Sequence, residues 1–185
     1  MSFEESLVWH ASPTLASIKT ANLYSFRFRN IIECLETIHR FNELMNDKGI
    51  YIELLKSTED LYLIYVYRKS HLQIVLSDRK IRDFLKKYSY SSSESMDGLL
   101  ETLRMRLNTE RDFPHEIGVF LGYPLEDVKA FIETKGSNSV LCGDWKVYHD
   151  EDTARCLFCK YKHCRETYIK VYREGRRLID MLVSA

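Results

Sequence analysis

A histidine and a glutamate stand side by side at positions 115 and 116, directly after Pro114, and this pair is the best candidate in the chain for acid–base chemistry. Proline is favoured at the first position of a helix, where its missing N–H group costs nothing. We therefore expect a helix to begin near residue 113, with His115 and Glu116 in its first turn. The helix dipole there favours a carboxylate and a neutral imidazole, which suits a base or a metal ligand. The pair is equally typical of a solvated helix cap, and both interpretations remain open.

Residues 9–23, WHASPTLASIKTANL, repeat this arrangement around a second proline. Pro13 predicts a helix that begins near Ser12. Its first turn would present free backbone N–H groups beside an imidazole and hydroxyl groups, an arrangement that suits an anion. A capped surface helix is the alternative. The candidate ligand-binding residues of this segment are His10, Thr14, Lys19 and Asn22.

Further candidates stand where strands end and helices begin. Arg68 follows the apolar stretch 61–67, and the ends of buried strands often border crevices. Trp145 and Lys146 follow a glycine, and they provide either an aromatic wall beside a cation or an anchor that ties a strand to the core. Tyr123 precedes the third proline, at the expected start of another helix, and completes the candidate ligand-binding set.

Cysteine and histidine spacing gives one cluster with metal-ligand chemistry. Cys156, Cys159 and His163 follow one another at i, i+3 and i+7, which places them within about 60° of one helical face. Structural zinc sites need four ligands, usually from two segments. The chain has no second pair with the required spacing, so we expect no metal site. The sequence assigns no cofactor.

Composition limits the classes of protein to consider. Twenty-seven Lys and Arg residues balance 27 Asp and Glu residues, so no net positive charge favours nucleic acid. No apolar run approaches the roughly 18 residues of a membrane span, and residues 1–10 lack the features of a signal peptide. Five cysteines without a disulfide-scaffold spacing are typical of reduced thiols. We expect a cytoplasmic protein that binds neither nucleic acid nor membrane.

The apolar pattern predicts an α+β fold in one domain over residues 1–185, with a small, mostly antiparallel sheet wrapped by about seven to eight helices. The clearest helix runs from Asn30 to Gly49, a good residue to end a helix. Arg104 and Arg106 stand two residues apart on an expected helix and therefore lie on different faces, so at most one of them should face inward. Strands are expected at 23–29, in the two halves of 49–68 around a turn at 57–60, and at 144–150, helices at 71–77, 79–88, 96–108 and 151–175, and a loop at 91–93.

Familiar catalytic motifs do not occur in the sequence. It lacks the phosphate-binding G-x-x-x-x-G-K-[ST], the dinucleotide-binding G-x-G-x-x-G, the hydrolase G-x-S-x-G and the zinc-protease H-E-x-x-H. Standard nucleotide-binding, hydrolase and zinc-protease functions therefore have no support from motifs.

Several of these segments together resemble one family of uncharacterised small bacterial proteins, classed as a domain of unknown function. Residues 10–23 are similar to its HCAPTLAGIKxANL, residues 113–128 to FPHEIGxFLGYPxEDV, and residues 143–148 to GxWKVY, and the apolar strand ends in Tyr-Arg as in the family. Ala11 departs from the pattern, because the family has cysteine there, and Ser12 and Ser17 also differ. The resemblance names no activity but implies one polar site formed by His10, Lys19, Arg68, His115, Glu116, Trp145 and Lys146.

These observations lead to three hypotheses. The first is a binding protein for an anionic small molecule or cofactor, including haem or another metal-containing cofactor with His10 or His115 as axial ligand. The alternative is a small-molecule enzyme that uses His115 as general acid or base, with Glu116 or Asp127 orienting it. The second alternative is a regulatory or protein-interaction module that docks through the aromatic-rich C-terminal helix. Ligand, reaction and oligomeric state do not follow from the sequence.

Overall fold

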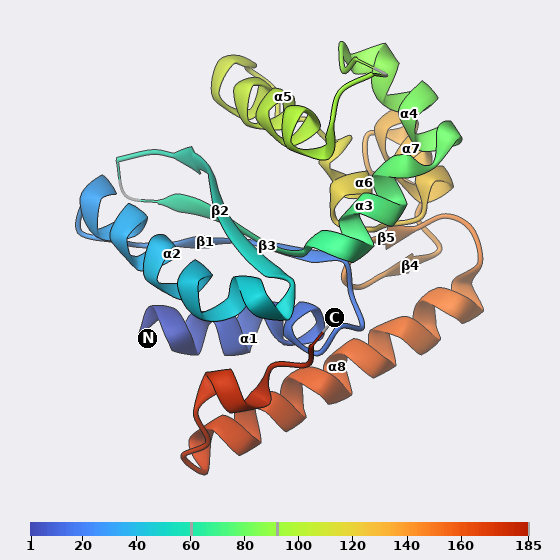
Figure 1. Cartoon of the computed structure of the whole chain (residues 1–185). Helices are drawn as coiled ribbons and strands as arrows, with labels where there is room; N and C mark the ends of the chain where they lie inside the picture. The colour runs from blue at the N-terminus through green and yellow to red at the C-terminus, as the bar shows by residue number, and fades with distance from the viewer. Residues whose placement is uncertain (60, 92, 185) are drawn as a thin grey trace. The chain divides into compact units, whose positions relative to one another are not determined.

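A computed structural model describes residues 1–59, 61–91 and 93–184 of the chain. The chain clusters into two compact units, Met1–His71 with Tyr161–Ala185 (unit 1) and Leu72–Lys160 (unit 2). The long helix α8 (Glu151–Arg173) supplies residues to both units (Figure 1). The assignment of residues 1–185 to one domain stays a prediction.

Unit 1 is built on a three-stranded antiparallel sheet with the strand order β1-β3-β2. The strands are β1 (Ala21–Phe26), β2 (Ile50–Ser57) and β3 (Tyr62–Arg68), which confirms the three strands expected in this region. The central strand β3 is almost entirely buried, as its continuous apolar run predicts. The turn expected at 57–60 includes residue 60, which lies outside the described residues.

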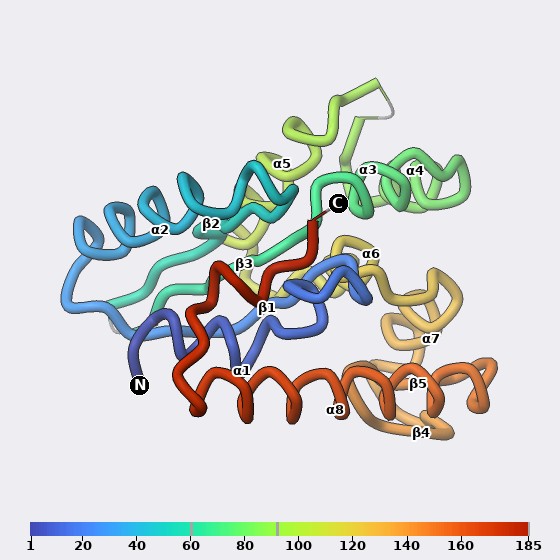
Figure 2. Tube along the Cα trace, turned by 60° about the horizontal axis from the view of Figure 1, so that its bottom comes forward, coloured from blue at the N-terminus to red at the C-terminus, as the bar shows by residue number. Residues whose placement is uncertain are grey.

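Two helices of unit 1 pack against the sheet and form its core. Helices α1 (Phe3–Leu15) and α2 (Ile31–Met45) contribute Leu7 and Phe41 to a cluster that includes Ile64 and Val66 of the central strand. Asn30 caps α2, and Gly49 follows it in the left-handed conformation at φ 75°, as expected for the clearest helix of the sequence. Helix α1 also lies side by side with α8 (Figures 1 and 2).

A side chain forms hydrogen bonds with the outer edge of strand β2. The Asn42 amide on α2 donates to the carbonyl oxygen of Ile52 at 2.9 Å and accepts from the Ile52 N–H group at 2.8 Å. This pair of bonds reproduces the pattern that a neighbouring strand would make. The helix therefore satisfies both backbone groups of Ile52 on the side away from β3.

Unit 2 is mainly helical. The strand expected at 144–150 is reduced to two residues, which pair with two others in a short hairpin. The loop expected at 91–93 includes residue 92, outside the described residues.

The other elements of the chain are α3 (Lys69–Ser77), α4 (Arg79–Leu85), α5 (Met96–Thr109), α6 (Ile117–Phe120), α7 (Leu125–Thr134), β4 (Leu141–Cys142), β5 (Lys146–Val147) and the 3-10 turns η1 (Asn46–Lys48), η2 (Lys86–Tyr88) and η3 (Leu178–Met181).

The helix predicted to begin near Ser12 ends there instead. Helix α1 begins after Ser2, whose hydroxyl accepts from the Glu5 N–H group at 3.1 Å while the Glu5 carboxylate accepts from the Ser2 N–H group at 2.7 Å. This reciprocal capping box fixes the start of the helix ten residues earlier. Pro13 lies inside the last turn of α1, so this proline marks a helix C-terminus and not an N-terminus.

The expected fold class is confirmed. The described residues form eight α-helices with small antiparallel sheets, so the chain is α+β. Within the ranges that the structure describes, no helix combines the length and the apolar character needed to cross a membrane.

Candidate functional site

The end of α1 carries carbonyl groups where the sequence suggested free N–H groups. The Arg68 guanidinium at the end of β3 donates to the carbonyl oxygens of Thr14 at 2.8 Å, of Lys48 at 2.9 Å, and of Leu15. The last carbonyls of a helix have no partner within the helix and form its negative end, so a cation suits them. Arg68 is fully buried, and burial lowers its pKa from the ordinary value. Arg68 therefore caps the end of α1 from inside the unit and binds three backbone oxygens in all.

The neighbouring candidates of unit 1 also bond within the core. Thr14 donates from its hydroxyl to the amide oxygen of Asn22 at 2.7 Å, and both side chains are buried. Lys19 is buried with its ammonium group 5.5 Å from the centre of the Tyr161 ring. These contacts link the turn after α1 to the first strand and to α8.

His10 differs from these residues because it lies at the surface of α1. Its ring stacks on the Tyr24 ring at 4.7 Å between centres. Partial burial, and then the positive charge of Arg165, lower the pKa of His10 from its ordinary value. His10 is therefore mainly neutral at pH 7, and it lies close enough to α8 to sense a cation there.

In unit 2 the adjacent residues His115 and Glu116 differ in burial. His115 is exposed and meets the edge of the Phe131 ring at 5.0 Å between centres. It lies in a turn, because α6 begins only at Ile117 and has four residues. The expectation that His115 and Glu116 occupy the first turn of a helix starting near residue 113 is therefore wrong. The backbone of 114–116 closes single turns before the helix forms.

Glu116 is bound by partners other than His115. Its Oε1 accepts from the Arg106 guanidinium at 2.6 Å and from the Tyr90 hydroxyl at 3.1 Å, and the carboxylate is only 1% exposed. Burial opposes the charge of Arg106, but the hydrogen bond and charge of Glu116 and the charge of Glu110 outweigh it and raise the pKa of Arg106. Arg106 thus faces inward while Arg104 pairs with Glu101 near the surface, as expected for two positions on different helix faces.

A second buried carboxylate fixes Trp145. Asp127 accepts from the Trp145 indole at 2.8 Å and from the backbone N–H groups of Tyr148 at 2.9 Å and His149 at 3.0 Å. The Tyr123 ring stacks on the Trp145 indole, with 5.2 Å between the ring centres. Of the two interpretations of Trp145, these contacts favour the anchor. Oδ1 of Asp127, a candidate to orient His115, also lies 3.3 Å from Nδ1 of His149.

Lys146 and the glycines of residues 113–128 also have structural partners. The Lys146 ammonium donates to the Gly136 carbonyl at 2.6 Å, just after α7. A Cβ atom on Gly118 would lie 2.7 Å from a methyl group of Val128, so only glycine lets α6 approach α7 this closely. Gly122 has φ 77°, a conformation that favours glycine. Much of this motif is accounted for by local packing.

The cysteines are all free thiols. Cys156 and Cys159 are exposed on α8, as their shared helical face with His163 predicts. Among the described residues, no group of three or more His, Cys, Asp or Glu side chains is arranged to hold a metal ion.

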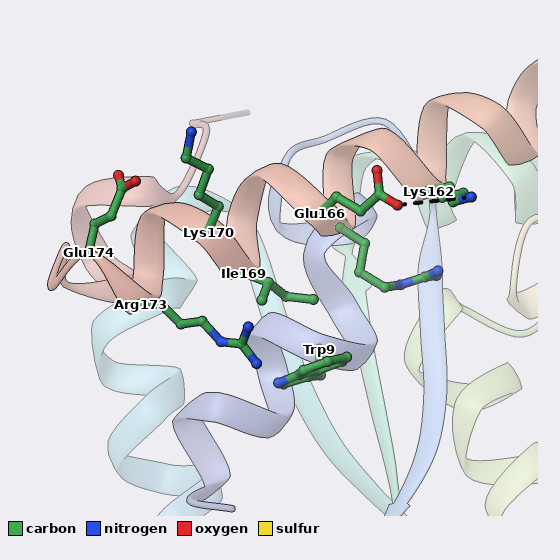
Figure 3. Close-up of a pocket in the computed structure, with 8 residues that line it drawn as sticks. Trp9, Lys162, Glu166, Ile169, Lys170, Arg173 and Glu174 are labelled. Atoms are coloured by element: carbon green, nitrogen blue, oxygen red, sulfur yellow. Dashed lines mark ion pairs between the residues drawn. The ribbon is translucent and has the colours of Figure 1, made fainter.

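One concave surface gathers side chains that the sequence did not single out. A groove of about 790 Å³ runs between α1 and the C-terminal half of α8, within unit 1 (Figure 3). Trp9 is 42% exposed in it, and the Arg173 guanidinium lies 5.7 Å from the centre of the Trp9 ring. Ile169 and Arg173 point from α8 toward that ring, whereas Lys170 and Glu174 point away from it. The residues that line the groove are Trp9, Lys162, Arg165, Glu166, Ile169, Lys170, Arg173 and Glu174.

The α8 side of this groove has a signal in the sequence. Lys162, Ile169 and Arg173 are spaced at i, i+7 and i+11, which keeps them within about 40° of one helical face. The pairing of that face with Trp9 depends on how α1 and α8 pack, and no local pattern encodes it. His10 adjoins the groove through its interaction with Arg165, so one member of the predicted set lies beside this surface.

The members of the predicted set fall into two groups, one in each unit. Unit 1 holds His10, Thr14, Lys19, Asn22 and Arg68, and unit 2 holds His115, Glu116, Tyr123, Trp145 and Lys146. Within each unit the described contacts of these residues are to backbone groups, rings or neighbouring polar side chains of the same unit.

Comparison with known proteins identifies the family. A family model described as "Protein of unknown function (DUF3793)" matches residues 7–182. The chain belongs to this family. The match covers nearly the whole DUF3793 chain and confirms the resemblance to a family of unknown function. No curated protein and no solved structure matches this chain significantly.

Proposed function

We propose that this DUF3793 protein binds an anionic small molecule or cofactor in the groove between α1 and α8. The observation that carries the proposal is the Trp9 ring, which lies exposed on the groove floor with the Arg173 guanidinium over it. An exposed aromatic ring provides a flat apolar surface, and a nearby guanidinium binds carboxylate or phosphate groups with directed hydrogen bonds.

The charge of the groove supports an anion. Four of the eight lining residues are cations and two are carboxylates, so the groove has an excess of two positive charges in a chain with none overall. Its volume of about 790 Å³ falls within the range of sites for small molecules. By contrast, Arg68 and Lys19 are buried in contacts with their own unit, which makes them weaker candidates for ligand contacts.

A thermal-shift panel tests this proposal. The probes are inorganic phosphate, a nucleoside triphosphate, aliphatic carboxylates and haem, the last also followed by visible absorbance. Because a ligand that binds only the folded state stabilises it, at least one anion should raise the melting temperature of the wild-type protein. Arg173→Gln and Trp9→Ala should reduce that shift.

Arg176→Gln is the matched control, because Arg176 is exposed just beyond the end of α8 and does not line the groove. It removes the same charge and should leave the shift unchanged. The proposal is overturned when no anion of the panel stabilises the wild-type protein, or when Arg173→Gln and Arg176→Gln respond equally.

A further inference from the structure

We infer that the groove selects an elongated ligand with an apolar body and an anionic group at each end. This inference rests on the proposed anion-binding function and specifies its ligand class. The order of side chains along α8 carries it, because cations stand on both sides of an apolar centre.

The apolar centre consists of Ile169 on α8 and Trp9 on α1. The Ile169 side chain points toward the Trp9 ring, and both residues line the groove (Figure 3). A hydrocarbon or aromatic body that lies on this pair removes apolar surface from water, which is favourable in proportion to the area covered.

The two cationic ends lie one to two helical turns from this centre. Lys162 and Arg165 line the groove on the N-terminal side of Ile169, and Arg173 lines it on the C-terminal side. Arg165 and Arg173 are eight residues apart, so their backbone positions differ by about 12 Å along the helix axis. A single compact anion reaches only one end, whereas a ligand of matching length places one anionic group at each.

The two carboxylates that line the groove, Glu166 and Glu174, point away from the Trp9 ring. Glu166 pairs with Lys162 at 4.0 Å, and both side chains are more than half exposed, so this contact is weak. Glu174 points away from Trp9, on the outer side of α8. Arg173 contacts the ring itself and is oriented into the groove.

Isothermal titration calorimetry with simple carboxylates tests the inference. Decanedioate carries two carboxylates on a long apolar chain, decanoate carries one on a chain of the same length, and hexanedioate carries two on a shorter chain. We expect the wild-type protein to bind decanedioate at least about fivefold more tightly than decanoate or hexanedioate, the gain typical of one additional exposed ion pair.

Variants at the two ends provide the second measurement. Arg165→Gln and Arg173→Gln should each weaken decanedioate about fivefold and weaken decanoate by a clearly smaller factor, because decanoate loses one of the two ends at which it can bind. Lys162→Gln, at an exposed position, is a second variant for the Arg165 end. The matched controls Lys160→Gln and Arg176→Gln lie outside the groove and should bind all three carboxylates like the wild type.

The outcomes separate this inference from the proposed function. Equal affinities for decanoate and decanedioate, both lost in Arg173→Gln, would leave the anion-binding groove intact and overturn the two-ended ligand. Equal affinities for hexanedioate and decanedioate would overturn the spacing. When none of the three carboxylates binds, the inference fails, while the phosphate and haem arms of the thermal-shift panel still decide the proposed function.

Discussion

Each unit of the molecule holds an arginine in its interior, fully buried Arg68 in unit 1 and partly buried Arg106 in unit 2, and different groups stabilise the two cations. Arg68 in unit 1 donates to three backbone carbonyls, and among the described residues no carboxylate forms an ion pair with it. Arg106 in unit 2 binds the Glu116 carboxylate at 2.6 Å and that of Glu110 at 2.7 Å. One cation is stabilised by the dipoles at a helix end, and the other by full opposite charges.

Both arginines show that a cation in the interior of a unit can be purely structural. At the end of a strand, Arg68 suggested a ligand site, but the end of α1 supplies its acceptors from within the same unit. Of Arg104 and Arg106, the sequence allowed at most one to face inward without showing which, and Arg106 is the one that forms a cluster with buried Glu116 and Tyr90. The type of residue and its place in the sequence do not distinguish these cases, because the deciding partners come from distant segments.

The largest effect is expected for Arg68→Met. This change removes a charged donor from three carbonyl oxygens, and those of Thr14 and Leu15 keep only a backbone donor. Because a hydrogen bond to a charged group contributes about 1.5–3 kcal/mol, we expect a loss of about 4 kcal/mol in the free energy of unfolding, measured by urea denaturation. Arg68→Lys should lose somewhat less, because a single ammonium group does not span three acceptors.

Arg27→Met is the control for the loss of a cation, since Arg27 is exposed in the same unit. Its effect should stay within about 0.5 kcal/mol. A loss below about 1 kcal/mol for Arg68→Met would show that the bonds to the end of α1 contribute little.

A smaller loss, about 3 kcal/mol, is expected for Glu116→Gln. The change removes the buried one of the two carboxylate charges that pair with Arg106, and breaking such a pair is costly. The double variant Arg106→Met/Glu116→Gln should be more stable than the sum of the two single losses predicts, because it removes both charges. Strict additivity in urea denaturation would show that the two side chains act independently, and would remove the contrast with Arg68.

The smallest effect is a gain, for Ser17→Gly at the end of α1. Ser17 has φ 60°, and the N–H of the next residue donates to the Pro13 carbonyl at 2.9 Å, the pattern of a helix end that favours glycine. We expect a gain of about 0.5–1 kcal/mol, seen as a melting temperature a few degrees higher.

The matched control for this gain is Ser25→Gly, in the exposed part of β1. Glycine weakens a strand, so this variant should lose stability. Equal losses for the two glycine variants would contradict the gain expected from the left-handed conformation of Ser17.

Local signals in the sequence were sufficient for many elements. Asn30 and Gly49 delimit α2 and its final 3-10 turn because both ends carry their own capping residues. Pro13 predicts a helix start near Ser12, whereas the capping box of Ser2 and Glu5, also present in the sequence, sets the start of α1. Proline restricts the backbone in a way that fits either a helix start or a last turn, so its position alone does not decide.

The candidate site was harder to predict than the fold. His10 lies beside the groove, but Trp9 and Arg173 come from opposite ends of the chain and meet only because α1 packs along α8. The spacing of residues in the sequence predicts the cationic face of α8, but no spacing predicts that Trp9 lies opposite that face. A groove between two helices is a property of their packing, and composition or motif spacing carries no direct record of it.

The bonds between Asn42 and Ile52 have a consequence for how these chains behave at high concentration. An open strand edge is a template on which a second chain can add, and this is a common route to aggregation. The amide of Asn42 occupies both backbone groups of Ile52, the third residue of β2. One side chain thus interrupts the edge within the strand and makes this border of the sheet a poor template for growth.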